Sequence, residues 1–238
     1  MSLATTFVDR VDAGRQLSAA LGSFAAQDPI VLGLARGGVP VAAEVARALG
    51  APLDVLLVRK LGVPYQPELA FGAIGEGGTK VLSPQLIRHL TLSDQEMADV
   101  EKRERAELAR RLTRYRAGRE PLPLNGRTVI IVDDGLATGT TARAAVQVVR
   151  DRGARAIIVA APVGSREARD AVAGVADVVI CLSTPETFRA VGQWYEDFEQ
   201  TSDDEVTRLL RQVPAPRGTE VVNARFTATP QHSNPRGT

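Results

Sequence analysis

Val129–Thr141 reads V-I-I-V-D-D-G-L-A-T-G-T-T, and it joins four branched apolar residues to two acids, a loop of small residues and a helix start. Because the apolar run contains no polar residue, it is typical of a strand that is buried on both faces of a parallel sheet. Asp133 and Asp134 then lie at the carboxyl end of this strand, the edge where open α/β sheets bind ligands. The segment therefore predicts an α/β fold with a ligand site beside two acids.

The loop Gly135–Thr141 is suited to holding a phosphate, because it contains two glycines, three threonines and no charge. Its backbone N–H groups and hydroxyls can surround an anion, and the helix that begins near Thr140 adds its positive end. Carboxylates repel a phosphate, so we expect Asp133 and Asp134 to face ribose hydroxyls, a Mg²⁺ ion or both. The alternative is a strand–loop–helix unit with a surface acidic pair.

This segment resembles the signature of the type I phosphoribosyltransferases, which use phosphoribosyl pyrophosphate (PRPP). The shared pattern is an apolar strand, two acids and a T-G-x-T loop. The resemblance implies that Asp133 and Asp134 hold the ribose 2′- and 3′-hydroxyls, and that Ala137–Thr141 hold the 5′-phosphate. The residues of this loop that we expect to bind PRPP are Gly135, Ala137, Thr138, Gly139, Thr140 and Thr141.

A second loop between a strand end and a helix start, Gly33–Pro40, reads G-L-A-R-G-G-V-P. Gly37 and Gly38 allow backbone conformations that other residues resist, and Arg36 offers a bidentate cation to phosphate oxygens. The loop resembles the family's first loop, which binds pyrophosphate and often contains a non-proline cis peptide. The candidate bonds are those on either side of Arg36. A glycine turn with an exposed arginine is the alternative.

Arg59 and Lys60 follow the strand predicted at 53–58, so we expect them at the same carboxyl edge. Relatives place a basic residue there against pyrophosphate, and Lys60 is our first candidate for this role, with Arg59 second. The alternative is a surface basic pair that ends a strand. Residues 64–68 are expected at the tip of a loop, which in relatives closes over the reacting centre and excludes water.

An aromatic segment follows the last predicted strand, within residues 183–198. It contains Phe188, Trp194, Tyr195 and Phe198, although aromatic residues make up only 4% of the chain. Relatives build the pocket for the acceptor base from the equivalent region. Trp194 and Tyr195 are our candidates for stacking on a planar acceptor ring, by analogy with base stacking worth about 1–3 kcal/mol. The alternative is a small core that packs the helix predicted at 201–212 onto the sheet.

Apolar runs alternate with helical patterns along most of the chain, which implies parallel crossovers and a doubly wound, mostly parallel sheet flanked by helices. Strands are predicted at 29–34, 53–58, 69–74, 129–133, 156–161 and 175–182, and helices at 7–25, 40–49, 140–152, 166–173 and 201–212.

The expected domain covers residues 1–212, with a small hood at 183–212 and a tail at 213–238 that we predict to be disordered. A charged helical insertion at 83–120 interrupts the alternation. A capping box marks the start of its helix, and i,i+4 pairs such as Glu101–Arg105 follow. We interpret it as a solvated, salt-bridged helix, although its basic residues could instead serve polyphosphate.

The composition of the 238-residue chain narrows the class of protein. A net charge of +1 favours neither nucleic acid nor a membrane as partner, and 44% hydrophobic residues suffice for a core. The single cysteine, Cys181, rules out an internal disulfide framework and fits a reducing compartment. No signal peptide is evident. We therefore expect a cytoplasmic protein, and a homodimer because relatives are often dimers.

The sequence thus predicts a phosphoribosyltransferase that uses PRPP and Mg²⁺ and transfers the 5-phosphoribosyl group to a nitrogenous acceptor, a nucleobase-like ring. The predicted catalytic residues are Asp133, Asp134, Arg36 and Lys60, and the two acids are also the predicted metal ligands. One rival is a non-catalytic regulator that senses PRPP or a nucleotide. Another is a hydrolase of phosphosugars or nucleotides. The sequence does not indicate which acceptor is used.

Overall fold

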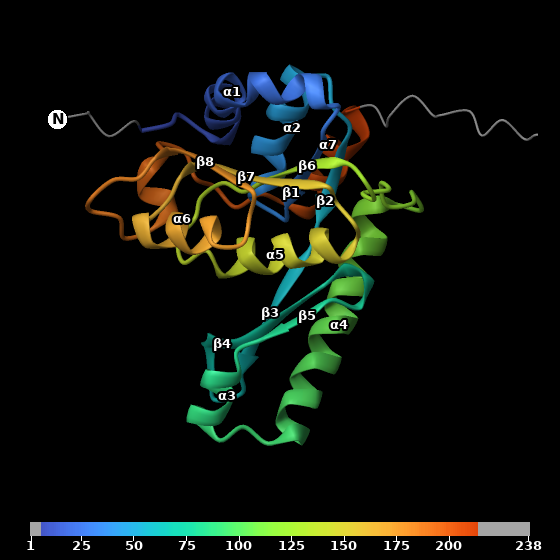
Figure 1. Ribbon diagram of the computed structural model, residues 1–238, viewed down its shortest axis with the longest axis vertical. Coiled ribbons are helices and arrows are strands. Elements are labelled where there is room, and N and C mark those ends of the chain that lie inside the picture. Colours follow the sequence, from blue (N-terminus) through green and yellow to red (C-terminus); the bar gives the residue numbers. More distant parts are fainter. Residues whose placement is uncertain (1–5, 214–238) are drawn as a thin grey trace, which may run out of the picture.

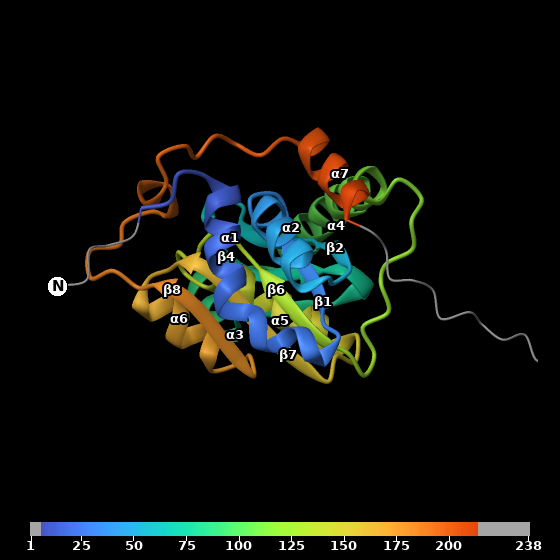
Figure 2. The ribbon, with the colours of Figure 1, turned by 90° about the horizontal axis from the view of Figure 1, so that it is seen from above.

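The computed structural model describes residues 6–213, apart from the side chains at positions 67 and 68. A five-stranded parallel sheet of order β2-β1-β6-β7-β8 lies at its centre (Figures 1 and 2). The doubly wound parallel fold predicted from the sequence is confirmed. The strands are β1 (Ile30–Leu34), β2 (Leu53–Leu56), β6 (Thr128–Val132), β7 (Ala156–Val163) and β8 (Val178–Ser183).

Helices cover both faces of this sheet, so β1 and β6 are buried along their whole length (Figure 1). Successive residues of a strand point to opposite faces, and each face therefore has its own core. The core on the side of α1, α2 and α7 includes Val31 and Ile130, and the core on the side of α5 and α6 includes Leu32 and Ile131. The helices are α1 (Arg10–Leu21), α2 (Gly38–Leu49), α5 (Thr140–Asp151), α6 (Arg166–Ala173) and α7 (Asp203–Gln212).

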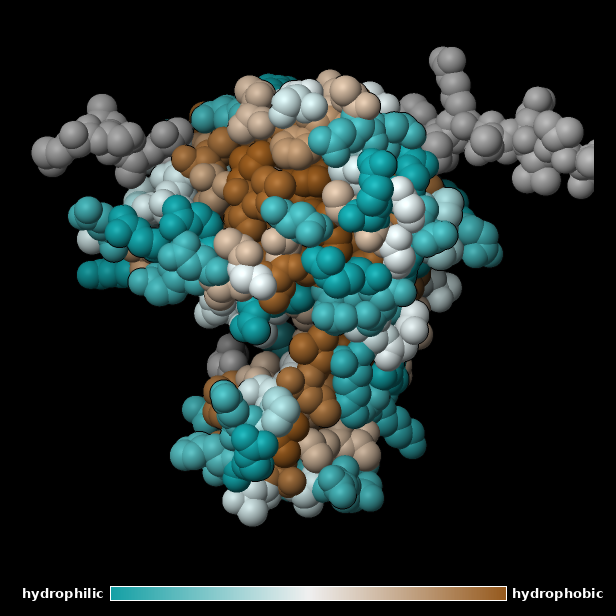
Figure 3. Space-filling model, viewed as in Figure 1, coloured by the Kyte–Doolittle hydropathy of each residue, from teal (hydrophilic) through white to brown (hydrophobic). Residues whose placement is uncertain are grey.

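Residues 58–116 form a finger that projects from the body (Figure 1). Its three-stranded antiparallel sheet has the order β3-β4-β5 and packs against α4 around a small core that includes Phe71 and Val100. Figure 3 shows a stripe of apolar residues that continues from the body into the finger between hydrophilic flanks. The elements are β3 (Val58–Val63), β4 (Gln66–Gly75), β5 (Lys80–Leu82), α3 (Pro84–Leu90) and α4 (Asp94–Arg116).

The strand predicted at 69–74 exists, but its assignment to the parallel alternation is wrong. It belongs to β4, which pairs antiparallel with β3 through the turn at Pro64–Tyr65. The expected loop at 64–68 is therefore mostly a tight hairpin turn, and Arg59 and Lys60 lie inside β3 rather than beyond a strand end. The error arose because a short apolar run has the same composition in either kind of sheet.

The charged insertion is helical as predicted, since α4 starts with the capping box formed by Ser93 and Glu96 and carries the Glu101–Arg105 pair. Among the helices of residues 6–213, none combines the length and the apolar character that crossing a membrane requires. The predicted tail lies outside the described residues, except for its first residue, Val213, which is buried.

Buried charges connect the root of the finger to the body. Arg116, at the end of α4, donates to Glu76 Oε2 over 2.7 Å and contacts Asp54 Oδ2 at 3.3 Å. All three side chains are at most 10% exposed. Burial opposes the charge of Arg116, but the two carboxylates outweigh it and raise the pKa of the guanidinium. The cation therefore stays charged and is shared by two buried acids, and Arg152 Nη1 adds a second positive charge 3.7 Å from Glu76 Oε2.

Replacing Arg116 with Met should lower the free energy of unfolding by about 3–5 kcal/mol, because Asp54 and Glu76 would lose their shared cation inside the protein. Urea unfolding followed by circular dichroism measures this loss. The control is Arg110→Met on the same helix, where the side chain is 58% exposed and pairs with Glu107. This surface pair should cost no more than about 1 kcal/mol. Equal losses in the two variants would contradict a special role for the buried cluster.

Candidate functional site

The acid pair lies at the carboxyl end of β6, where the sequence places it. The N–H of Asp133 donates to Ala160 O of β7 over 3.1 Å, and the N–H of Asp134 donates to Asp133 Oδ1 over 3.0 Å. Burial raises the pKa of both carboxyls, and the charge of Asp134 raises the pKa of Asp133 further. Two crowded carboxylates of this kind are stabilised by a cation or by hydroxyl donors.

Arg10 is the counter-ion of this pair, and sequence reasoning missed it. Its Nε donates to Asp134 Oδ2 over 2.9 Å, and the Arg10 side chain is only 12% exposed. The guanidinium lies 3.9 Å from the centre of the Phe198 ring, and its Nη1 donates to Glu199 O over 2.6 Å. Arg10 belongs to no motif and is 124 residues away from Asp134 in the chain. No local pattern could therefore have revealed it.

The predicted phosphate loop connects β6 to α5. Gly139 precedes α5 in the left-handed conformation, with φ of 71°, which favours glycine. A Cβ at this position would also lie only 3.0 Å from Ala168 O, which favours glycine for a second reason. Ser165 Oγ donates to Ala137 O over 3.0 Å and fixes the middle of the loop. A cavity of about 100 Å³ lies against the loop. It is lined by Lys60, Asp133, Gly135, Leu136, Ala137, Thr138, Gly139, Thr141 and Ala142.

Unlike its neighbours Gly139 and Thr141, Thr140 is not among the residues that line this cavity. It is the first residue of α5, and Thr138 Oγ1 donates to its hydroxyl over 3.2 Å. The N–H of Thr140 donates to Thr138 Oγ1 over 3.4 Å. The start of α5 thus adjoins the loop, and the positive end of a helix favours an anion there.

The glycine loop after β1 packs directly on the acid pair. A Cβ on Gly37 would overlap Asp134 Oδ2, and one on Gly38 would lie 2.5 Å from Val132 O, so both positions require glycine. The peptide bond between Ala35 and Arg36 is cis, which is one of the two bonds proposed from the sequence. A second cavity of about 420 Å³ lies here. It is lined by Arg10, Arg36, Gly37, Asp134, Phe198, Gln200 and Thr201.

The two neighbouring basic residues of β3 have different surroundings. Arg59 donates from Nη2 to Glu104 Oε2 over 2.6 Å and is therefore held by α4. Lys60 is exposed and lines the same cavity as Asp133 and the phosphate loop. The fold thus places Lys60 and Asp133 around one cavity. Lys60 lies within the hairpin strand β3, and not after the end of a parallel strand as predicted.

Trp194 and Tyr195 are buried, with exposed fractions of 8% and 6%, in a small core with Phe7 and Val163. The Tyr195 hydroxyl donates to Asp134 O over 2.6 Å, and burial raises its pKa. The aromatic segment thus forms a small core, as the alternative proposed, but this core packs α1 and the chain before it onto the sheet rather than α7. In this conformation the rings offer little surface to a ligand, and their stacking on an acceptor stays a prediction.

The two acids can supply part of the ligand set of a magnesium ion. Residues 6–213 contain no group of three or more His, Cys, Asp and Glu side chains that could hold a metal on their own. Asp133 and Asp134 supply two carboxylates, and Mg²⁺ commonly binds one or two carboxylates together with substrate phosphates and water. The predicted metal ligands are therefore sufficient only together with oxygens from the substrate.

Replacing Asp133 with Asn should stabilise the ligand-free protein near neutral pH. Because folding raises the pKa of Asp133, its ionisation costs stability as pH rises from about 4, the ordinary value, to the raised value, and the full cost remains above it. The variant should therefore melt more than about 2 °C above wild type at pH 8 without divalent ions, with the gap vanishing toward pH 4.

Thermal melts between pH 4 and pH 8 measure this difference. Asp204→Asn is the control, because that side chain is 92% exposed and its substitution should leave no comparable pH-dependent gap. An Asp133→Asn protein that melts below wild type at pH 8 would contradict the cost that burial, and then the charge of Asp134, impose on the ionised Asp133.

Comparisons with known proteins show which family this chain resembles. Two Mycobacterium tuberculosis strains each have a protein described as a phosphoribosyl transferase that is 55% identical over 204 residues, which are 86% of this chain and 46% of theirs. The chain thus spans about half the length of these curated relatives. The bifunctional protein PyrR of Chloroflexus aurantiacus is 32% identical over 120 residues, which are 50% of this chain and 60% of its own.

A solved structure and a family model extend the likeness. The crystal structure of TT1426 from Thermus thermophilus has 45% sequence identity and a TM-score of 0.77, covering 88% of this chain and 99% of that chain. The model of the phosphoribosyl transferase domain matches residues 12–199, which include the phosphate loop, the acid pair and the glycine loop. This chain therefore belongs to the phosphoribosyl transferase domain family.

Proposed function

We propose that this chain transfers the 5-phosphoribosyl group of PRPP to a nitrogenous, nucleobase-like acceptor and releases pyrophosphate. The observation that carries the proposal is the meeting of three elements around the acid pair. The phosphate loop follows Asp134, the Arg36 loop packs on the two carboxylates, and Lys60 lines the cavity beside Asp133. Together they offer binding groups for each charged part of PRPP.

Each part of PRPP has its own group of residues in this proposal. The loop at 137–141 binds the 5′-phosphate through backbone N–H groups, hydroxyls and the start of α5. Asp133 and Asp134 accept hydrogen bonds from the ribose hydroxyls. Arg36 and Lys60 supply the positive charge that binds the pyrophosphate. The substrate is thereby oriented at three points before any bond breaks.

The charges of these residues match the charge that develops in the reaction. As the acceptor nitrogen attacks the anomeric carbon, the sugar gains positive character, which the nearby carboxylates stabilise. The leaving pyrophosphate gains negative charge, which Arg36 and Lys60 neutralise. Bound Mg²⁺ would supply further neutralisation of the pyrophosphate. The acceptor is itself the nucleophile, so no side chain has to form a covalent intermediate.

The acceptor is proposed to bind beside residues 183–198. Val191 of this segment lies so close to Gly135 that a Cβ on the glycine would be 2.5 Å from Val191 Cγ1, which places the segment against the start of the phosphate loop. Stacking by Trp194 or Tyr195 would require this segment to open. Tyr195 has a second role available without opening, because its hydroxyl fixes the backbone of Asp134.

The double variant Asp133→Asn, Asp134→Asn tests the PRPP site. Wild type should bind PRPP in the micromolar range with Mg²⁺, and the double variant at least about 100-fold more weakly, because hydroxyl and metal ligands are both lost. Isothermal titration calorimetry with and without Mg²⁺ measures both affinities. Equal binding by the two proteins would overturn the assignment of the acids.

A screen of heterocyclic acceptors, with pyrophosphate release as the readout, separates catalysis from sensing. A transferase releases pyrophosphate only with a suitable acceptor. The Asp133→Asn, Asp134→Asn variant is the negative control. PRPP binding with no turnover in a broad screen would favour the non-catalytic regulator. Phosphate release without an acceptor would favour the hydrolase. Light scattering on the same samples tests the expected homodimer.

Lys60→Ala should weaken the binding of magnesium pyrophosphate by about tenfold, since one cation of the proposed site is lost. Arg59→Ala is a matched control on the adjacent position of the same strand. Because Arg59 is already paired with Glu104, its loss should change the affinity by less than about twofold. Calorimetric titration of both variants measures the difference. A larger loss in Arg59→Ala would assign the role to the second candidate of the sequence analysis.

A further inference from the structure

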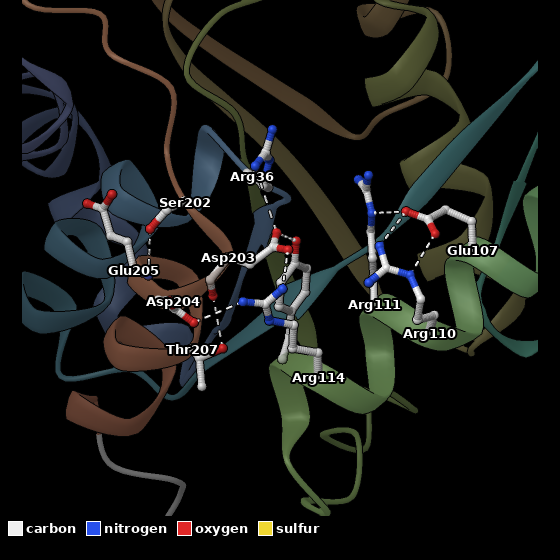
Figure 4. Close-up of polar contacts among 11 residues, drawn as sticks. Arg36, Glu107, Arg110, Arg111, Arg114, Ser202, Asp203, Asp204, Glu205 and Thr207 are labelled. Atoms are coloured by element: carbon white, nitrogen blue, oxygen red, sulfur yellow. Dashed lines mark hydrogen bonds and ion pairs between the residues drawn. The ribbon is translucent and has the colours of Figure 1, made fainter.

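Asp203, the first residue of α7, lies among basic and hydroxyl groups from two other parts of the chain (Figure 4). The Tyr115 hydroxyl donates to its Oδ1 over 2.6 Å, and Arg114 Nη1 donates to its Oδ2 over 2.8 Å. Arg36 Nη1, from the proposed pyrophosphate loop, lies 3.8 Å from Oδ1. An aspartate outside the motifs thus faces the arginine that we assign to the leaving group.

The contacts of Asp203 differ in strength, and the contact with Arg36 is the weakest. A separation of 3.8 Å is beyond hydrogen-bond range, so Arg36 is attracted only by charge. If Arg36 moves away, Asp203 keeps Tyr115 and Arg114 as close partners. The nearby Arg110 and Arg111 pair with Glu107 on α4 instead (Figure 4). Arg36 can therefore leave Asp203 at little cost.

The protonation states fit this arrangement. The Tyr115 hydrogen bond, followed by the charges of Arg114 and Arg36, lowers the pKa of Asp203 against the effect of its partial burial. Burial, and then Asp203 itself, raise the pKa of Tyr115 to about 12. Asp203 is therefore ionised at neutral pH, while Tyr115 keeps the proton that it donates.

We infer that Asp203 competes with pyrophosphate for Arg36. It holds the guanidinium in the ligand-free protein, releases it to the phosphate oxygens on binding, and attracts it again as pyrophosphate leaves. Asp203 is thus a positioning residue that weakens pyrophosphate binding and favours its departure. This inference rests on the proposed function, because it assumes that the anion at Arg36 is pyrophosphate.

Asp203→Asn tests the competition, with Asp204→Asn as the matched control. Asp204 is the next residue and pairs with the same Arg114 at 2.9 Å, but it does not contact Arg36. Calorimetric titration with magnesium pyrophosphate should show roughly threefold or more tighter binding by Asp203→Asn, and a change below about twofold for Asp204→Asn. Unchanged or weaker binding by Asp203→Asn would overturn the inference.

Two further variants separate competition for Arg36 from a long-range effect of the charge of Asp203. In an Arg36→Ala background, Asp203→Asn should no longer tighten binding, whereas an equal gain there would mean that Asp203 acts at long range and not through Arg36. Tyr115→Phe keeps the charge of Asp203 but frees one of its lone pairs for Arg36. It should therefore weaken pyrophosphate binding, and tighter binding would overturn the inference.

The failure of this inference differs from the failure of the proposed function. If wild type binds neither PRPP nor pyrophosphate, the proposed function fails. If wild type binds both and the Asp203 variants behave as their controls, only the competition fails. Thermal melts of every variant establish that the affinities compare folded proteins.

Discussion

The contact between the glycine loop and the acid pair is the constraint on which the site depends. β1 and β6 are neighbours in the parallel sheet, with Gly33 paired to Val132, so the two chains leave the sheet side by side. A loop that follows β1 can then pack on the carboxylates that follow β6, provided that it carries no side chain at Gly37 and Gly38. The result is that the cation of Arg36 and the two carboxylates lie at one sheet edge.

The finger extends this edge with a group that the parallel sheet could not supply. β2 lies beside β1 in the parallel sheet, and β3 begins shortly after it in the separate sheet of the finger. β3 carries Lys60, which lines the cavity at the phosphate loop. The position of Lys60 depends on the orientation of β3, which is set at its base by the buried cluster of Arg116, Asp54 and Glu76. A buried charge network at the root of the finger thus bears on the place of Lys60, the residue that we propose for pyrophosphate binding.

Features that depend on residues close together in the chain could be predicted from the sequence. Glycine loops, the acid pair after an apolar strand and the capping box at Ser93 each depend on residues close in the chain, and their patterns predicted them. The cis peptide was expected only from the family resemblance, at either bond of Arg36, and it is the bond between Ala35 and Arg36. Strand direction is not local, so the run at 69–74 was assigned to the wrong sheet. Arg10 was missed for the same reason, since only the folded chain brings it to Asp134.

The non-local contacts share one feature: charged residues that we propose to bind PRPP have partners of opposite charge within the protein. Asp134 should face ribose or metal, and Arg10 neutralises it; Arg36 should face pyrophosphate, and Asp203 partly neutralises it. These internal partners neutralise charges that would otherwise lower the stability of the fold when buried without a partner. A ligand that binds through Asp134 or Arg36 competes with these internal partners, which lowers its affinity in the ground state. An enzyme benefits from such weakening, because tight binding of substrate or product raises the barrier to the next step.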